Sequence, residues 1–446
     1  MKALGIDLGT TKVAAVIYDQ TDQVLAAAGM AHNAAVKTGD ANAFEQDVES
    51  IMQCVDRVVT QLPLELRKQI SAVGITGQMH SLLMMKNRTQ VSHLTTWQDH
   101  RCGADLIEDF NRIANLKLRE GFGGTTLARL ARSGELQQWD QCATISDFLA
   151  AELCGNTRII TDPTHAASWG LYDLDCNCWD LEAVQKLNIA PAILPEIRPC
   201  GKIIGHLSKK YADLWRLPEN IAVANAIGDN QASILGTGSD FDGEIYLTLG
   251  TGAQLSLVSE NFSGRLPENI EIRPFPGNKQ LLVAAPLCGG AAFAFLADTV
   301  NSFRTALGEA PLERGVLLDK LDALGMEYLQ QNTTPDITIA PHFSGERHAP
   351  ELRGSISNLT LNNATPGALA AALAYGIVRN LKNGFPAEVL QNRRCVIGSG
   401  NAVRLVKSIQ HAIKQEFALP LQLASGREEA ASGAAKQALE QAAKTD

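Results

Sequence analysis

The stretch Leu4-Gly-Ile-Asp-Leu-Gly-Thr-Thr-Lys12 has a second, weaker copy at Ile245-Tyr-Leu-Thr-Leu-Gly-Thr-Gly-Ala253. Each copy is an apolar strand that runs into a turn of glycine and threonine. Glycine lets the backbone approach a ligand closely, and threonine places a hydroxyl beside free amide donors. Because a concave run of N–H groups suits phosphate, the two copies predict two related lobes that hold a nucleotide.

The length and charge of the chain limit the class of protein. A chain of 446 residues predicts two domains, and glycine, serine and aspartate crowd together at 236–242, which indicates a boundary there. We therefore expect domains at residues 1–238 and 239–446. The net charge of −9 does not indicate the basic surface that binds nucleic acid or an anionic membrane. A phosphate site must then be built locally, from amides, hydroxyls and metal.

The cysteines and apolar runs indicate a cytoplasmic protein. The nine cysteines contain no pair of Cys-x-x-Cys units, so a zinc site is not expected. Cys176-Asn-Cys178 is interpreted as a coincidence in a loop, and the cysteines are expected to be free thiols in a reducing cytosol. A strand beginning at residue 3 leaves no room for a signal peptide. The apolar run Leu281–Leu296 is shorter than the roughly 20 residues of a membrane span, and favours a buried strand followed by a helix.

Strand-like and helical runs alternate along the chain, which predicts an α/β architecture. Apolar residues recur at helical spacing over Ala43–Leu62. A hairpin is expected around the first glycine-threonine turn, and a similar order of strands is expected after Gly243. The expected strands are Ala3–Asp7, Val13–Asp19, Gln23–Ala28 and Ala72–Ile75 in the first half, and Glu244–Leu249, Gln254–Val258 and Gln280–Ala285 in the second.

Asp7 ends an apolar strand immediately before the first turn. A carboxylate there could hold Mg²⁺, directly or through water, and bridge it to nucleotide phosphates. Alternatively, the aspartate only stabilises the turn through its own backbone. The second copy of the turn favours the metal role.

Asp229 follows the apolar strand 221–227 and precedes a helix. A carboxylate in this position could accept the proton of a substrate hydroxyl as its oxygen attacks a γ-phosphate. Capping of the helix N-terminus is an equally frequent role for aspartate. The sequence leaves these two interpretations open.

Four further loops combine hydrogen-bonding groups with glycine or large apolar side chains. Gly74-Ile-Thr-Gly-Gln-Met-His80 and Thr96-Trp-Gln-Asp-His-Arg101 offer the mixture that a polyhydroxylated sugar with an apolar C–H face requires. Ile397-Gly-Ser-Gly-Asn-Ala402 follows a strand and opens a helix, so its amides could face adenosine or phosphate. Each of these loops, and Gly345-Glu-Arg-His348, is by itself better explained as an ordinary turn or solvated loop.

Taken together, these segments resemble the carbohydrate kinases of the FGGY family, and within it the sedoheptulokinases most closely. The resemblance runs nearly end to end, and eight motifs in order make it specific. The motifs are Gly5-Ile-Asp-Leu-Gly-Thr-Thr11, Gly77-Gln-Met-His80, Val91-Ser-His-Leu-Thr-Thr-Trp-Gln-Asp-His-Arg-Cys102, Gly121-Phe-Gly123, Ala166-Ala-Ser-Trp-Gly170, Gly228-Asp229, Gly345-Glu-Arg-His348 and Gly398-Ser-Gly400.

The resemblance implies two actin-like domains of the ribonuclease H fold with a catalytic cleft between them. Residues 1–238 would bind the sugar and carry catalysis, and residues 239–446 would bind the nucleotide. It also implies ATP with Mg²⁺ as the phosphoryl donor and a small ketose, phosphorylated at a primary hydroxyl, as the acceptor. A homodimer is one assembly that the sequence leaves open.

Carried over position by position, the resemblance assigns residues to four roles. Asp229 and Asp7 become the catalytic carboxylates and the metal ligands. The nucleotide contacts are Gly9, Thr10, Thr11, Lys12, Gly250, Thr251 and Gly252 at the phosphates, and Gly400 and Asn401 at the adenosine end. The sugar contacts are Gln78, Met79, His80, Trp97, Asp99, Arg101 and Asn230.

The sequence also departs from the family pattern. Many relatives carry a basic residue where this chain has Ala14, and Lys12, on the same face of the strand, could substitute for it. The lysine-and-tryptophan pattern common near Gly121-Phe-Gly123 is absent from 125–136, and Asn401 and Ala402 replace glycines. Two alternative functions stay open: a kinase of xylulose or ribulose, and a non-catalytic actin-like regulator that binds ATP or a sugar.

Overall fold

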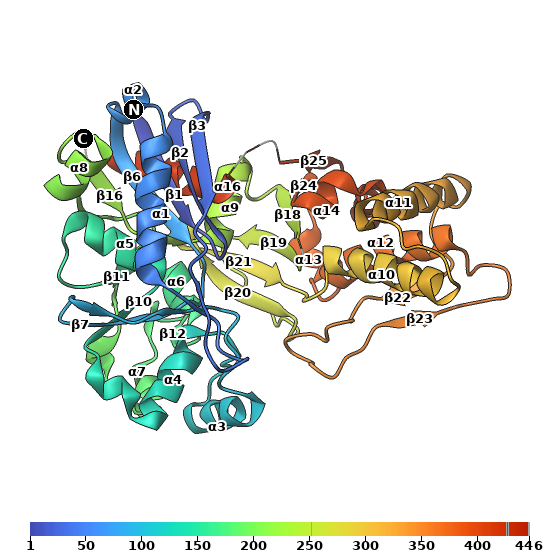
Figure 1. Ribbon diagram of the computed structural model, residues 1–446, viewed down its shortest axis with the longest axis horizontal. Coiled ribbons are helices and arrows are strands. Elements are labelled where there is room, and N and C mark those ends of the chain that lie inside the picture. The colour runs from blue at the N-terminus through green and yellow to red at the C-terminus, as the bar shows by residue number, and fades with distance from the viewer. Residues whose placement is uncertain (251, 425, 427, 445–446) are drawn as a thin grey trace. The chain divides into compact units, whose positions relative to one another are not determined.

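The computed structural model describes residues 1–250, 252–424, 426 and 428–444, and the chain divides into two compact units (Figure 1). The first unit contains 1–237, 273–278 and 426–446, and the second contains 238–272 and 279–425. The main division therefore falls one residue from the predicted boundary. The units differ from the predicted domains at two further places, because 273–278 and the C-terminal segment are grouped with the first unit.

The first unit is built on a sheet whose strands lie in the order β15-β16-β6-β1-β2-β3, with β17 also paired to β6. The β1 strand is antiparallel to β2 and parallel to β6, and β16 and β17 are also parallel to β6. The strands span Lys2–Leu8 (β1), Lys12–Asp19 (β2), Val24–Ala31 (β3), Ile70–Gly77 (β6), Ile203–His206 (β15), Ala222–Ala224 (β16) and Ile227–Gly228 (β17).

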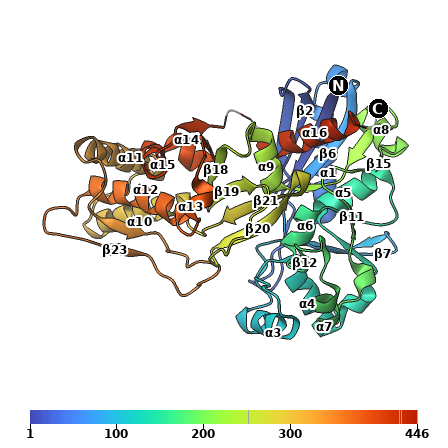
Figure 2. The ribbon, with the colours of Figure 1, turned by 180° about the vertical axis from the view of Figure 1, so that it is seen from behind.

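Side chains of β1 alternate between two helical layers. Leu4, Ile6 and Leu8 are buried in the core that also holds the apolar face of α1 (Val48–Gln61). The opposite face of the sheet is covered by α16 (Glu429–Ala442), which Figure 2 shows lying across the strands. This alternation is the period-two pattern of a strand that is buried on both faces.

The small residues of α16 explain why the end of the chain returns to the first unit. A Cβ atom on Gly5 would lie 1.9 Å from the carbonyl oxygen of Ala431, and one on Gly74 would lie 1.9 Å from that of Ala434. Glycines in the sheet and alanines in the helix thus let the two backbones approach closely. The sequence shows the small residues of this helix but not the sheet against which they pack.

The remaining elements of the first unit form small sheets and helices around this sheet. A second apolar cluster there contains Trp169 and Trp179. The elements are β4 (Ala35–Val36), β5 (Glu45–Gln46), α2 (Leu64–Arg67), β7 (Leu83–Lys86), β8 (Gln90–Val91), β9 (Leu94–Thr95), α3 (Ala104–Ala114), α4 (Gly123–Ser133), β10 (Gln141–Ala143), α5 (Ile145–Cys154), β11 (Ile160–Thr161), α6 (Pro163–Ser168), β12 (Tyr172–Asp173), β13 (Cys178–Trp179), α7 (Leu181–Lys186), β14 (Glu196–Ile197), α8 (Lys209–Trp215) and α9 (Asp229–Thr237).

The second unit repeats the strand order of the first. Its sheet has the order β20-β21-β19-β18-β24-β25, in which the antiparallel pair β18–β19 corresponds to β1–β2, and β24, parallel to β18, corresponds to β6. The predicted duplication is therefore confirmed at the level of topology. The strands are β18 (Glu244–Leu249), β19 (Ala253–Ser259), β20 (Ile270–Phe275, whose last residues, 273–275, are grouped with the first unit), β21 (Lys279–Ala284), β24 (Cys395–Ser399) and β25 (Leu421–Leu423).

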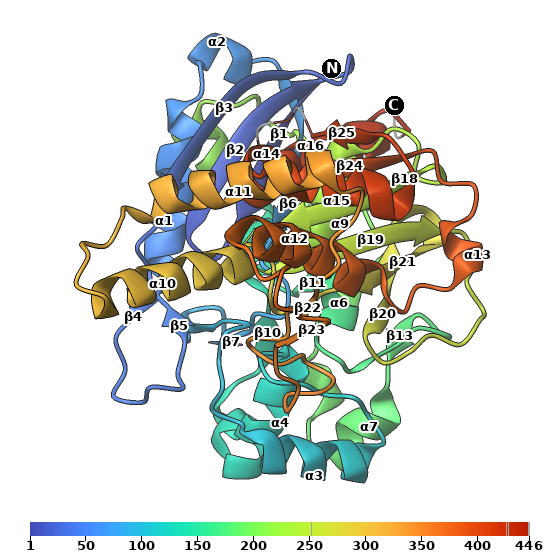
Figure 3. The same ribbon diagram turned by 90° about the vertical axis from the view of Figure 1, so that its right-hand side faces the viewer.

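Helix α12 (Pro366–Lys382) is buried on most sides in the core of the second unit. It packs against α11 (Arg314–Gln331) and α15 (Lys407–Phe417), and Figure 3 shows α11 and α12 side by side. The other elements are α10 (Gly290–Ala306), β22 (Thr338–Ala340), β23 (Ser355–Ser357), α13 (Ala387–Leu390) and α14 (Asn401–Leu405).

The apolar run 281–296 forms the end of β21 and the start of α10, as predicted. Among the residues that the structure describes, no helix is both long and apolar enough to cross a bilayer.

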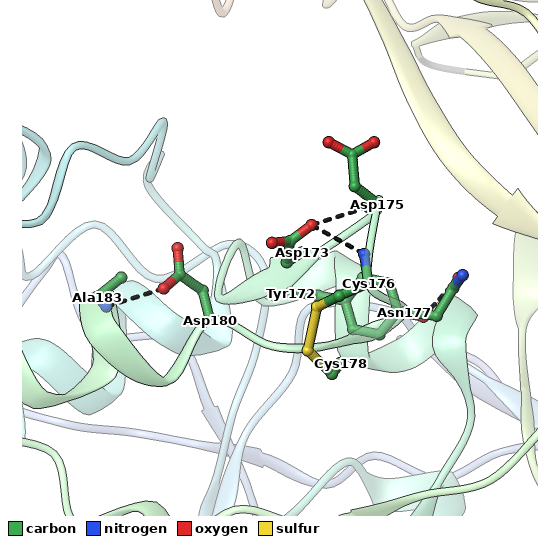
Figure 4. The surroundings of a disulfide bond; sticks show 8 residues. All are labelled: Tyr172, Asp173, Asp175, Cys176, Asn177, Cys178, Asp180 and Ala183. Atoms are coloured by element: carbon green, nitrogen blue, oxygen red, sulfur yellow. Dashed lines mark hydrogen bonds between the residues drawn. A yellow bond between two sulfur atoms is a disulfide. The ribbon is translucent and has the colours of Figure 1, made fainter.

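The prediction that the cysteines are all free thiols is wrong for one pair. Cys176 and Cys178 form a disulfide in the turn between β12 and β13 (Figure 4). The Asp173 carboxylate accepts hydrogen bonds from the backbone N–H groups of Asp175 and Cys176 and shapes this turn, which brings the two cysteine Cα atoms within 5.4 Å. Such a separation suits a disulfide.

The close approach of α16 to the sheet generates a stability prediction. Gly74→Ala should lower the free energy of unfolding of the first unit by about 2–3 kcal/mol, because the new methyl group overlaps the helix backbone. The measurement is the melting temperature by calorimetry. Gly39→Ala is the matched control, since its Cβ would meet nothing within 4 Å, and it should change stability by less than about 0.5 kcal/mol. Equal melting temperatures for the two variants would contradict this packing argument.

Candidate active site

Two aspartates and a glutamine lie where three neighbouring parallel strands end. In the register of the sheet, Leu8 of β1 is paired with Gly77 of β6, which is paired with Gly228 of β17. Asp7 precedes the first of these residues, and Gln78 and Asp229 follow the other two. Because the carboxyl ends of parallel strands meet at one edge of a sheet, this edge is the usual position of a binding site in α/β folds.

Asp7 carries a buried, unsatisfied oxygen. Its Oδ1 atom is inaccessible to solvent and has no hydrogen-bond partner. Burial, together with the negative charges of Asp229 and Glu428 and against the opposing charge of Lys12, raises the pKa of Asp7 to about 7. A bound cation would stabilise the ionised form of such a buried carboxylate, whose oxygen has no other partner.

Asp229 is the first residue of α9 and is partly exposed. Its Oδ1 accepts a hydrogen bond of 2.7 Å from the backbone N–H of Asn230. Burial raises the pKa of Asp229 to about 6, while that N–H group and the charge of Arg273 act in the opposite direction. The carboxylate is thus ionised at neutral pH and yet more basic than an ordinary aspartate, which suits proton abstraction. The contact with Asn230 shows that a helix-terminal role and a chemical role are geometrically compatible.

One hydrogen-bond network joins the first glycine-threonine turn to two of the predicted sugar residues. Gln46 donates to the carbonyl oxygen of Thr10 (2.7 Å) and accepts from the side-chain amide of Gln78 (3.0 Å). The indole N–H of Trp97 donates to the Thr10 hydroxyl (2.9 Å). The hydroxyl can still donate its own proton to a phosphate oxygen. The Trp97 side chain is 40% exposed and offers an aromatic face beside the turn.

Met79 and His80 also lie at this edge. Met79 is buried, and its sulfur would lie 2.9 Å from a Cβ atom on Gly228. His80 has a positive φ of 68°, and its ring stacks on Phe122 with centroids 4.8 Å apart. Ser168 fixes His80, because its hydroxyl accepts from the histidine backbone N–H and its carbonyl oxygen lies 2.6 Å from the ring Nδ1.

Asp99 and Arg101 form an ion pair. The Arg101 guanidinium lies 2.8 Å from Asp99 and 2.7 Å from Glu45. The Asp99 carboxylate also accepts from the backbone N–H of Phe44. The Nη2 atom of Arg101 and the Nδ2 atom of Asn230 are both buried without a hydrogen-bond partner.

The Lys12 amine is paired with a carboxylate. Its amine donates to both carboxylate oxygens of Glu428, each at 2.8 Å, just before α16 begins. Glu428 itself has a positive φ of 58°, an uncommon conformation for a residue other than glycine. A phosphate that binds Lys12 must therefore compete with Glu428.

In the second unit, three glycine segments gather around the turn after β18. The N–H group of Gly290 donates to the carbonyl oxygen of Gly250 (2.9 Å), and a Cβ atom on Gly289 would lie 2.2 Å from the carbonyl oxygen of Gly252. Gly400 has a φ of +85°, and its Cβ would lie 2.3 Å from the carbonyl oxygen of Leu249. Only glycine permits these approaches.

The predicted residues of this region fall around that cluster. Gly400 precedes α14, which begins at Asn401. Thr251 lies outside the described residues. Gly289 and Gly290 were not predicted as site residues, although two glycines that follow a strand and open a helix are a usual sign of an anion site. Gln46 and Ser168 were not predicted either, and the sequence carries no comparable sign for them.

A protein-family model matches more than half of the length of the chain. Residues 2–236 match the N-terminal domain of the FGGY family of carbohydrate kinases. The chain belongs to this family. This FGGY protein is a carbohydrate kinase, as its sequence predicted.

Relatives support the assignment over the whole chain. Sedoheptulokinase from Homo sapiens is 30% identical over 454 residues, which cover 94% of this chain and 93% of that protein. The crystal structure of a xyloylose kinase from Brucella ovis covers 100% of this chain and 91% of its own, with a TM-score of 0.84 and 23% identity. Plasmodium falciparum glycerol kinase with ADP covers 100% of this chain and 90% of its own, with a TM-score of 0.82 and 19% identity. The predicted α/β fold with two actin-like domains is confirmed.

The carboxylates of this kinase suit a cation that keeps most of its water ligands better than a cation that is coordinated only by protein side chains. Among the described residues, no three histidine, cysteine, aspartate or glutamate side chains gather as a metal-binding group. Mg²⁺ usually keeps several waters and binds one or two carboxylates together with substrate phosphates. The unsatisfied Oδ1 of Asp7, with Asp229 close enough to raise its pKa, meets that requirement.

The raised pKa of Asp7 predicts a dependence of stability on pH. Because the folded-state pKa, about 7, exceeds the ordinary value of 3.8, folding favours the protonated acid. This contribution is complete below pH 3.8 and is lost as the pH rises through 7. In the absence of ligands and divalent cations, Asp7→Asn should therefore gain about 1–3 kcal/mol relative to wild type between pH 5 and pH 8.

Thermal unfolding of both proteins at several pH values measures this difference. Asp213→Asn, at an exposed position, is the control and should keep a constant offset from wild type. If Asp7→Asn also keeps a constant offset, the carboxylate is not destabilised by its surroundings.

Proposed function

We propose that the protein is an ATP-dependent ketose kinase, and specifically a sedoheptulokinase that converts sedoheptulose and ATP to sedoheptulose 7-phosphate and ADP. The observation that carries the proposal is Asp229, a carboxylate at the end of a parallel strand whose surroundings raise its pKa to about 6. The similarity to sedoheptulokinase over 94% of the chain supports the choice of sugar.

In this mechanism Asp229 accepts the proton of the primary hydroxyl while the hydroxyl oxygen attacks the γ-phosphate in line. Phosphoryl transfer needs little covalent chemistry from the protein, because positioning and electrostatic stabilisation provide most of the rate. Asp7, with Asp229, would hold Mg²⁺. When bound, this ion neutralises charge on the phosphates.

The glycine-threonine turns provide the nucleotide contacts of the proposal. Gly9, Thr10 and Thr11 in the first unit and Gly250 to Gly252 in the second would bind ATP phosphates through backbone amides and hydroxyls. Gly400 and Asn401 would lie at the adenosine end. The ADP bound by the glycerol kinase of the same fold supports a nucleotide role. Lys12 would contribute once it exchanges Glu428 for phosphate.

The sugar would lie against residues of the first unit. Gln78, His80 and Asn230 offer hydrogen-bonding groups, and Met79 and Trp97 offer apolar surface for the C–H face of the ketose. The internal pairing of Asp99 and Arg101 assigns them a supporting role at the wall of this site. A cytoplasmic location and a homodimer stay predictions.

Replacement of the proposed base tests the mechanism. Asp229→Asn should lower kcat by at least about 10³-fold, since it removes the group that accepts the proton, and should leave the Kd of ATP within about threefold of wild type. Steady-state kinetics and calorimetric titration measure the two quantities. Asp213→Asn is the exposed control with unchanged kcat. Near-normal turnover by Asp229→Asn would refute the role of this residue.

A panel of ketoses tests the substrate. The kcat/KM for sedoheptulose should exceed that for xylulose and ribulose by at least about tenfold, because polar groups left unpaired by a shorter sugar are costly. A coupled assay for ADP measures each value. A preference for a pentulose would support the alternative kinase. ATP turnover that is indifferent to every ketose would support the non-catalytic regulator.

A further inference from the structure

The residue before the proposed base, Gly228, is a glycine in close contact with two side chains. A Cβ atom on Gly228 would lie 2.9 Å from the sulfur of Met79 and 2.9 Å from the side-chain oxygen of Gln231. Glycine places few limits on its own backbone angles. The direction in which Asp229 leaves the strand must therefore be fixed by contacts rather than by the local conformational preference of residue 228.

Two threonine hydroxyls bind opposite ends of the peptide group that joins Ile227 to Gly228. The Thr76 hydroxyl donates to the carbonyl oxygen of Ile227 (2.7 Å), and the N–H group of Gly228 donates to the Thr164 hydroxyl (2.8 Å). Both threonine side chains are completely buried. One comes from β6 and the other from α6, so the plane of this peptide is held from two separate elements.

A buried aspartate sets the direction of one of these hydroxyls. Thr164 donates its proton to Oδ1 of Asp162 (2.6 Å), which leaves the lone pairs of the hydroxyl to face the N–H group of Gly228. Oδ1 of Asp162 also accepts from the backbone N–H of His165 (3.0 Å). Burial raises the pKa of Asp162 to about 6, while hydrogen bonds from Cys200 and Thr164 oppose this shift.

The neighbouring histidine, His165, is uncharged, as its buried position requires. Burial lowers the pKa of His165 to about 3, with the carbonyl group of Ile227 acting in the opposite direction. The imidazole is therefore neutral and adds no charge behind the Ile227–Gly228 peptide. Dipoles and hydrogen bonds, rather than a cation, hold this segment of backbone.

Capping of α6 explains only part of this arrangement. Asp162 is the N-cap residue of α6, and its bond to the N–H group of His165 fulfils that role. The cap does not require the hydroxyl of Thr164 to bind Gly228, which is 64 residues away in the sequence. Nor does it require Thr76 to bind the other end of the same peptide.

We propose that Thr164, oriented by Asp162, and Thr76 are positioning residues that aim the Asp229 carboxylate at the acceptor hydroxyl. The inference rests on the proposed role of Asp229 as the base. Thr76, Thr164 and Asp162 are completely buried, so we do not expect them to contact the sugar or ATP. Their removal should therefore lower the rate of the chemical step and leave substrate binding nearly unchanged.

The test is a comparison of Thr164→Val with Thr164→Ser. The valine variant keeps the shape but lacks the hydroxyl, and its kcat should fall about 10- to 100-fold, the cost of a small misplacement of a catalytic group. The KM values for sedoheptulose and ATP should stay within about threefold of wild type. The serine variant keeps the hydroxyl and should regain most of the lost kcat.

Thr144→Val is the matched control. Thr144 is also completely buried and donates its proton to a buried carboxylate, that of Asp147, at 2.8 Å, but it does not bind the Ile227–Gly228 peptide. It should lower the melting temperature as much as Thr164→Val does, with kcat within about twofold of wild type. Equal kcat values for the two valine variants would overturn the proposal.

Two more variants distinguish failure of the positioning role from failure of the proposed base. If Thr164→Val does not fold, Thr76→Val provides the same test from the other end of the peptide, and wild-type kcat in that variant would overturn the proposal. Asp229→Asn is measured in parallel. An inactive Asp229→Asn beside fully active threonine variants would refute only the positioning role. An active Asp229→Asn would refute the base itself.

Discussion

Strand β6 is the constraint on which the site of the first unit depends. It is hydrogen-bonded to β1 along one edge and to β16 and β17 along the other, all in parallel. The register of these ladders brings Asp7, Gln78 and Asp229 to the same edge of the sheet from three distant parts of the sequence. A slip of one residue in either ladder would turn a carboxylate to the other face. The backbone of a central strand, rather than any side-chain contact, thus determines which groups can act together.

The site concentrates groups that are unfavourable in the folded protein. Burial raises the pKa of both Asp7 and Asp229, and the charge of Asp229 also contributes to the raised pKa of Asp7. The Lys12–Glu428 pair adds one charge of each sign beside Asp7. A cation with a phosphate would satisfy the unpartnered oxygen of Asp7 and give Lys12 a second anion. These features destabilise the folded protein when the site is empty and favour the binding of ligands. Perturbed pKa values at functional sites commonly arise in this way.

The sequence predicted the features that depend on local pattern. The apolar strand and the return strand occur where expected in both halves, and the glycine-threonine turn joins them in the first half, because alternating burial and turn chemistry act over a few residues. Gln46, Ser168 and the docking of α16 were missed, since each depends on a contact between residues that are far apart in the chain. The disulfide was missed for another reason: the sequence shows the spacing of Cys176 and Cys178, but not the turn held by Asp173.

The two copies of the hairpin differ at a position that fits the different roles proposed for them. Asp7, two residues before Gly9, is paired in the sheet with Thr76, and Thr248, two residues before Gly250, is paired with Ser399. In the second copy the hydroxyls of Thr248 and Ser399 bond to each other at 2.7 Å. A neutral pair of hydroxyls has no charge with which to hold a cation or accept a proton at neutral pH, but it also does not repel phosphate. The same backbone frame can therefore serve binding where it ends in threonine and chemistry where it ends in aspartate.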